Sequence, residues 1–245
     1  MAVVATHPGR ILVGLIAHKG VRMSDATGPV AVPGHTSVHL WSLAEDVTVE
    51  PGDREGELVL AGRWGRERID DAAPVVQEAL RRMELGPVLL ANLAAGPVAG
   101  SAAGPDGSPV LLPLVPLLRR LDHLLVRTLG LDDLRGPLLS VIPLARRAPF
   151  APVRLPAGRP VRLPPDVSFT LRPAGVTLEA PGSAHRVILH RPEAAWVAAM
   201  LAWPVTPAAV SAALPLPPAV TGDILDYLAA ARMAAPAVDD EPGAG

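Results

Sequence analysis

The chain has 245 residues, of which 49% are hydrophobic and 19% charged, and this is the composition of a globular protein with a sizeable core. It contains no cysteine, which excludes disulfides, thiolate metal sites, iron–sulfur clusters and a cysteine nucleophile. The formal net charge of −2 argues against nucleic-acid binding driven by the overall charge of the protein.

The first elements in chain order fall in residues 1–40, which we expect to form an N-terminal extension that packs on the unit after it. The apolar run 11–17 is too short to span a bilayer, which takes about 20 helical residues. It could imitate the core of a signal peptide, but no A-x-A-like cleavage site follows it. The run is therefore interpreted as a buried strand, and the protein is expected to be cytoplasmic without a membrane partner.

An internal repeat organises the rest of the chain. Residues 47–83 and 167–201 each contain a strand, a turn, a second strand, a turn that ends in basic residues, a third strand and a helix. Three strands followed by helices, twice, are typical of winged helices. We therefore predict an α+β fold of two tandem winged-helix-like units, each a small antiparallel sheet followed by about three short helices. The first unit is placed at 41–150, the second at 151–235, and a disordered tail at 236–245.

In the first unit, a helix is predicted after Asp70 and Asp71 and is ended by Gly86-Pro87. The Gly/Ala/Pro/Ser-rich stretch near 94–109 is predicted to be a flexible insert. Leucines at helical spacing predict a helix over 114–129, and a short apolar strand is expected over 138–144.

In the second unit, alternating residues predict strands over 167–171, 176–179 and 185–190. Proline in the first turn opens a predicted helix at Pro192 and a second at Pro207, which is capped by Thr206. A third helix is predicted over 219–233 from its apolar stripe.

The search for catalytic chemistry leaves no catalytic, cofactor-binding or metal-binding residue. The spaced glycines at 96, 100 and 104 lack the GK[ST] of a phosphate loop, and no G-x-S-x-G surrounds a serine. His35 and His39 have strand-like and turn-like neighbours rather than a helix, and His185 and His190 are expected on opposite faces of one strand. Structural positions at helix N-termini or in solvated turns are expected for the remaining candidate acids, Asp70, Asp71, Asp132, Asp133 and Glu193.

Basic residues cluster in the first unit. They could simply form a solvated face. Their functional interpretation is a groove for an acidic peptide, in which an extended ligand adds to an exposed edge strand and arginines hold its carboxylates. The candidate peptide-binding residues are Arg66, Arg68, Arg81, Arg82, Arg119 and Arg120.

Several short runs, in order along the chain, resemble one family. They are 63–65, 79–88 followed by Asn92, 136–144 and 189–196. Together they are similar to the amino-terminal region of SagB-type peptide dehydrogenases, the azoline oxidases of thiazole/oxazole-modified peptide pathways. The likeness extends over about residues 41–233.

The resemblance implies a non-catalytic, winged-helix-like region that recognises the leader of a ribosomally made precursor peptide. In that family, flavin mononucleotide (FMN) is held by a following nitroreductase-like domain, which this sequence is not expected to contain, so no flavin-binding residue carries over. We therefore expect a recognition or scaffold protein that binds a precursor peptide, a separate flavin dehydrogenase, or both. The alternatives are a subunit of a split FMN-dependent dehydrogenase and a DNA-binding regulator, the latter disfavoured by the acidic pI of about 6.4.

Overall fold

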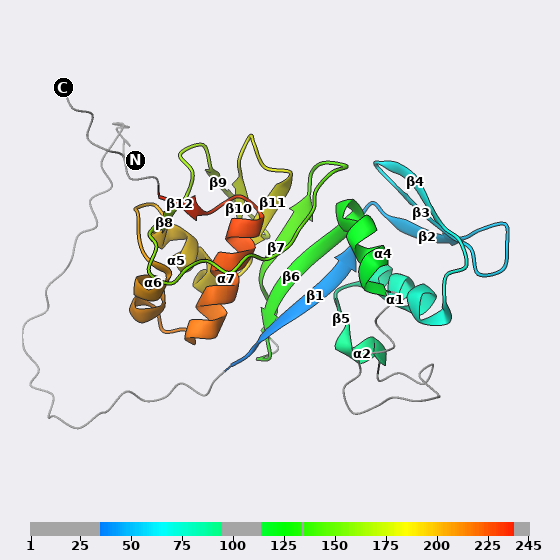
Figure 1. The fold of residues 1–245 in the computed structure, drawn as a ribbon, viewed down its shortest axis with the longest axis horizontal. Coiled ribbons are helices and arrows are strands. Elements are labelled where there is room, and N and C mark those ends of the chain that lie inside the picture. The colour runs from blue at the N-terminus through cyan, green and yellow to red at the C-terminus, as the bar shows by residue number, and fades with distance from the viewer. Residues whose placement is uncertain (1–34, 95–113, 134, 238–245) are drawn as a thin grey trace, which may run out of the picture. The chain divides into compact units, whose positions relative to one another are not determined.

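The computed structural model describes residues 35–94, 114–133 and 135–237, and Figure 1 gives the arrangement of their elements. These residues form antiparallel sheets and six α-helices, which confirms the predicted α+β class. The predicted strand at 11–17, most of the N-terminal extension and of the insert near 94–109, and residues 238–245 of the tail lie outside the described residues. No helix in the described ranges is long and apolar enough to cross a membrane.

A three-stranded antiparallel sheet opens the first predicted unit. It consists of β2 (Thr48–Pro51), β3 (Leu58–Gly62) and β4 (Gly65–Ile69), in that order. Arg63 and Trp64 connect β3 to β4, and Gly65, the residue after them, has a positive φ of 103° that favours glycine. The helices of this region are α1 (Pro74–Leu85), α2 (Ala91–Ala94) and α4 (Leu114–Arg120).

The larger sheet has seven strands, all neighbours antiparallel. Its order is β5 (Val88–Leu89), β1 (Ser37–Leu43), β6 (Leu125–Leu131), β7 (Pro137–Pro143), β11 (His185–Leu189), β10 (Gly175–Glu179) and β9 (Ser168–Arg172). Because β7 pairs with β11, strands from both predicted units belong to one sheet. Separate tandem units, each with its own sheet, are therefore not confirmed.

The helix predicted over 114–129 is wrong in its second half. Helix α4 ends at Arg120, a 3₁₀ turn covers Asp122–Leu124, and the chain then continues as strand β6. Strand β6 is buried along most of its length between β1 and β7. A strand covered on both faces is apolar at successive positions, and such a run cannot be told from a buried helix by its periodicity.

The second half of the chain follows its predictions closely. The three predicted strands correspond to β9, β10 and β11, and the predicted helices to α5 (Pro192–Met200), α6 (Pro207–Ala213) and α7 (Pro218–Ala230). The Thr206 hydroxyl accepts a hydrogen bond from the Ala209 N–H at 3.2 Å, as expected for a helix cap. Not predicted was the short pair of β8 (Val161–Arg162) and β12 (Ala235–Pro236).

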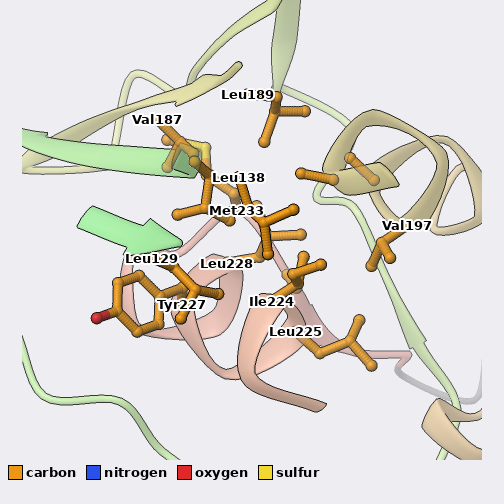
Figure 2. Close-up of a cluster of buried hydrophobic side chains, with 14 of the residues drawn as sticks. Leu129, Leu138, Val187, Leu189, Val197, Ile224, Leu225, Tyr227, Leu228 and Met233 are labelled. Atoms are coloured by element: carbon orange, nitrogen blue, oxygen red, sulfur yellow. The ribbon is translucent and has the colours of Figure 1, made fainter. Parts of the chain in front are cut away.

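Two hydrophobic cores form along the seven-stranded sheet. In the first, α5 contacts β7 and β11, and α7 contacts β1. Figure 2 shows Leu228 and Ile224 of α7 gathered with Leu129 and Leu138 of the sheet. The second core packs α1 and α4 against β3 and the start of β6. Strand β6 serves both cores, with Leu125 in the second and Leu129 in the first.

Candidate functional site

The outer edge of strand β4 is the feature that brings predicted site residues together. In the three-stranded sheet, β4 pairs with β3 on one side and with no strand of the described residues on the other. Arg66 lies opposite Ala61, and Arg68 opposite Val59. These side chains share the sheet face that points away from the second core, and they are 65% and 59% exposed.

Each of these two arginines has one acidic partner, Glu50 of β2 for Arg66 and Glu57, just before β3, for Arg68. Arg66 Nη2 donates to Glu50 Oε2 at 2.8 Å, and Arg68 Nε lies 2.8 Å from Glu57 Oε1. The Glu57 side chain is only 2% exposed, so Arg68 balances a buried charge whereas Arg66 does not. A guanidinium carries five N–H donors in a fixed fork, so both arginines keep donors for a further acid.

A shallow hollow of about 300 Å³ lies beside the two arginines. It is lined by Pro51, Gly52, Asp53, Val59, Arg66 and Arg68. Arg66 and Arg68 are the basic residues of this lining, and Asp53 is its one acid. The hollow can therefore take a side chain that projects from an extended segment lying along β4.

A third predicted residue, Arg120, reaches the same edge from helix α4. Its Nη2 donates to the backbone carbonyl of Arg68 at 3.2 Å. That carbonyl therefore points away from β3. Because the N–H and C=O of one strand residue point to the same side, the N–H groups of Arg68 and, two residues earlier, of Arg66 also face the free edge.

The other three predicted arginines do not join this edge. Arg82 lies on α1 and its Nε donates to Glu78 Oε1, one turn earlier, at 2.6 Å. Arg81 is exposed on α1 and Arg119 on α4. No hydrogen bond or ion pair among the described residues connects any of the three to β4. The candidate site is thus Arg66, Arg68 and Arg120.

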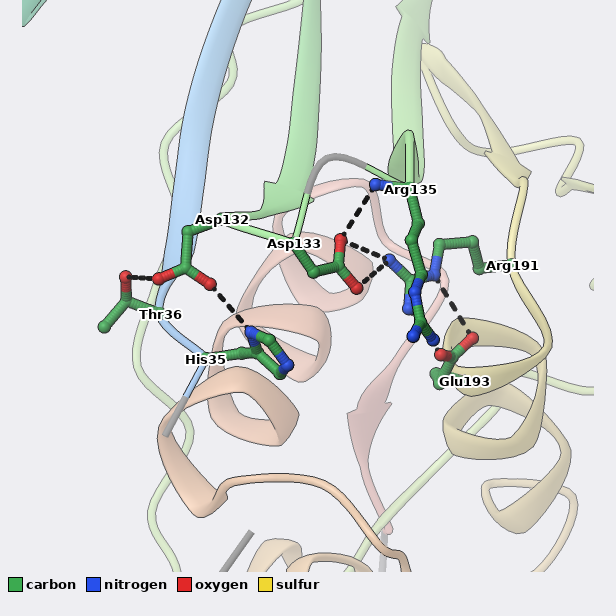
Figure 3. Close-up of polar contacts among 7 residues, drawn as sticks. All are labelled: His35, Thr36, Asp132, Asp133, Arg135, Arg191 and Glu193. Carbon is green, nitrogen blue, oxygen red and sulfur yellow. Dashed lines mark hydrogen bonds and ion pairs between the residues drawn. The ribbon is translucent and has the colours of Figure 1, made fainter. Parts of the chain in front are cut away.

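Sequence reasoning missed a cluster of ion pairs at the end of β6 (Figure 3). Arg191 Nη1 donates to both carboxylate oxygens of Asp133, at 3.0 and 2.9 Å, and its Nη2 donates to Glu193 at 2.5 Å. The hydrogen bonds from Arg191 hold the pKa of Glu193 below its ordinary value. Asp132 accepts from Thr36 and contacts His35. The expected turn position of Asp133 is correct, but its role is to tie that turn to α5.

A second missed network lies within the sheet and involves Ser140. Its Oγ lies 3.0 Å from Thr128 Oγ1 and 2.9 Å from His190 Nε2, and His190 Nδ1 lies 3.2 Å from the carbonyl of Ala174. Since only an N–H can bond a carbonyl, Nδ1 carries the proton and Nε2 accepts from Ser140. Burial lowers the pKa of His190, which favours this neutral form. The His190 ring thus accepts a hydrogen bond from the buried Ser140 hydroxyl. Its other nitrogen contacts the carbonyl of Ala174, where the histidine of a serine hydrolase contacts a carboxylate.

His185 and His190 have different partners, as expected, but only His185 belongs to β11, because the strand ends at Leu189 and His190 follows it. Burial alternates along β11, with His185, Val187 and Leu189 buried. The ring of His185 lies edge-on to Phe150, far along the strand from the network of Ser140. In the described ranges, no group of three or more histidines and acids is placed to hold a metal ion.

A hollow of about 520 Å³ lies between α6, α7 and the segment 154–157. Small side chains line most of it, and Asp226 is the one acid in the lining. Asp226 accepts from the Leu155 N–H at 3.1 Å, and burial raises its pKa. This hollow fits an apolar group, and its lining lacks the arginine cluster that an acidic peptide requires.

No model of a known protein family matches the sequence, and no curated protein matches it. The proposal that follows therefore depends on the residues and geometry of this chain.

Proposed function

We propose that this protein is a non-catalytic peptide-recognition or scaffold component of a ribosomal-peptide modification pathway that forms azoles by azoline oxidation. In this proposal it acts in the cytoplasm, where it binds the leader of a precursor peptide, a separate flavin dehydrogenase, or both. FMN belongs to that partner, and no residue of this chain is assigned to it. The observation that carries the proposal is the free edge of β4, at which Arg66, Arg68 and Arg120 meet.

The proposed binding mode is strand addition. An extended peptide pairs with the outward backbone groups of Arg66 and Arg68, so that its affinity comes from main-chain hydrogen bonds. Carboxylates of the peptide take the unused guanidinium donors, and charge-assisted pairs of this kind are about twice as strong as neutral hydrogen bonds. Arg120 leaves the Arg68 carbonyl as the peptide enters, and then faces the ligand.

The fold supports the proposal in a second way. Strands β2–β4 with α1 and α4, and strands β9–β11 with α5–α7, each follow the order of three strands and then helices that the repeat predicts. We propose that these two sets are the two units predicted from the repeat, joined through β1, β6 and β7. In this arrangement β4 is the last strand of its sheet and stands free for a ligand.

The test uses fluorescence anisotropy with a labelled peptide of alternating glutamate and valine. We expect saturable binding that weakens with salt, and an Arg66→Glu variant whose affinity falls about tenfold or more. Arg81→Glu, a change of an exposed arginine on α1 that is not connected to β4, serves as the matched control and should bind as the wild type does. A peptide with proline at alternate positions cannot pair along an edge and should not bind.

Results of two kinds would overturn the proposal, one from the binding assay and one from the absorption spectrum. One is binding that Arg66→Glu leaves unchanged, or no saturable binding at all. The other is a flavin absorption spectrum from the purified chain alone, because that would place the cofactor in this protein.

A further inference from the structure

The two larger sheets have four edge strands, and three of them carry features that discourage pairing with the same strand of a second copy. Strand β5 has only two residues and follows Pro87; β2 contains Glu50 and ends at Pro51; β4 contains Arg66, Glu67 and Arg68. Short length, proline and charge are the usual protections of an exposed edge.

The fourth edge strand, β9, lacks these protections. It has five residues, Ser-Phe-Thr-Leu-Arg, with no proline, and its one charge stands at its end. Phe169 and Leu171 lie opposite Leu178 and Val176 of β10, so they are on the core face of the sheet. They are nevertheless 48% and 82% exposed, because no described element covers the core face as far out as β9.

We propose that β9 pairs antiparallel with β9 of a second copy of this chain, so that the two seven-stranded sheets continue into one another. The inference is independent of the proposed peptide edge on β4.

The sequence of β9 is complementary to itself in one register. With the two-fold axis at Thr170, Phe169 lies opposite Leu171 of the second copy, and Leu171 opposite its Phe169. Phe169 and Leu171 of both copies then lie on the core face of the joined sheet. Directly opposed side chains of antiparallel strands are in contact, so each Phe169 packs on a Leu171. A shift by one residue would set Phe169 opposite Thr170 and mismatch the faces of the two sheets.

Charge on the other face agrees with the same register. Arg172 of the second copy falls opposite Ser168, whose neighbour on its own sheet is Glu179. Two strand spacings are about 10 Å, and an arginine can extend over the small serine toward that carboxylate. Glu179 is held from its other side by Arg186, whose Nε lies 2.5 Å from Oε1. The pairing thus gives each Glu179 a second arginine.

A five-residue strand pair is small beside the interfaces of permanent dimers, so we expect a dimer that dissociates on dilution. The test is sedimentation equilibrium on the full chain over a range of concentrations. Because the dimer is symmetric, Phe169→Glu and Leu171→Arg each place a charge opposite an apolar residue at two equivalent positions. Each variant should therefore lower the affinity of the dimer about tenfold or more. Trp203→Glu, which changes an exposed apolar residue outside β9, is the control and should leave the dimer intact.

The register itself is tested by mixing the two monomeric variants. In a mixed pair the introduced glutamate lies opposite the introduced arginine, and Leu171 of one chain lies opposite Phe169 of the other. We therefore expect equimolar Phe169→Glu and Leu171→Arg chains to form a heterodimer that neither forms alone. Circular dichroism of each variant shows that loss of the dimer is not loss of the fold. A monomeric wild type, single variants that still dimerise, or a mixture that stays monomeric would each overturn the proposal.

Discussion

Arg66 and Arg68 stand two residues apart on one face of β4, yet their acidic partners differ in burial. Glu50 is half exposed beside Arg66, whereas the Glu57 carboxylate beside Arg68 is almost fully buried. An exposed ion pair contributes about 0–1 kcal/mol, but a buried charge that loses its partner keeps its desolvation penalty. The two arginines are therefore expected to contribute differently to the stability of the fold.

This difference predicts a contrast between two alanine variants. Arg68→Ala should lower the free energy of unfolding by about 1–3 kcal/mol, because Glu57 is left buried without its cation. Arg66→Ala should change it by about 0.5 kcal/mol or less. Urea unfolding followed by circular dichroism measures both, and adding Glu57→Gln to Arg68→Ala should recover part of the loss. Equal effects of the two alanine variants would contradict the assignment.

At the scale of elements, Arg191 joins two segments that are distant in sequence, the turn after β6 and the start of α5. It stands between β11 and α5, and it reaches Asp133 in the turn after β6 and Glu193 in the first turn of α5. A bidentate arginine pair holds geometry as well as charge. The cluster therefore fixes where α5 begins relative to the central strands.

The lowered pKa of Glu193 predicts how this cluster responds to acid. A carboxylate whose pKa is lower in the folded protein than in the unfolded chain stabilises the fold at pH values above its ordinary pKa of 4.5. This contribution is lost as the pH falls through the pKa of the folded protein. Glu193→Gln should therefore be less stable than the wild type at neutral pH, by about 1 kcal/mol, and the gap should close in acid. Urea unfolding at neutral pH and below pH of about 4 measures the gap. A gap that is the same at both pH values would show that the charge of Glu193 is not its cause.

At the scale of the whole molecule, the seven-stranded sheet joins the two cores through β6. A strand whose residues belong to both cores cannot keep its pairing when either core melts. The two halves of the repeat are thus joined in stability although each resembles a separate unit in sequence.

We therefore predict one cooperative unfolding transition for both cores. Leu80→Ala in the second core and Leu228→Ala in the first should each lower the free energy of unfolding by about 2–5 kcal/mol, since both side chains are fully buried. Each variant should move a single transition, seen alike by near-UV and far-UV circular dichroism. Leu85→Ala, on the same helix as Leu80 but with a side chain 88% exposed, is the control. Two separate transitions in either variant would show that the cores unfold independently.

The sequence by itself was enough to predict the local elements of the second half. Alternation, prolines in first helical turns and the Thr206 cap are local signals, and the hairpin of β9 and β10 follows from its turn residues. At Gly175 a side chain would meet the Leu189 carbonyl at 2.2 Å, so this turn admits only glycine. Six arginines were proposed as peptide-binding residues from their clustering in the sequence, and three of them, Arg66, Arg68 and Arg120, lie at the free edge of β4.

Only the tertiary structure decided which strands share a sheet and which charges meet. Pairing of β7 with β11 joins residues about 50 positions apart, and no local pattern encodes such a partner. The identity of β6 depends on burial between two neighbours, which makes its leucines as consistent with a helix as with a strand. The meeting of Arg191 with Asp133, and of Arg120 with the Arg68 carbonyl, likewise results from long-range packing, because side-chain contacts follow from where the strands and helices come to lie.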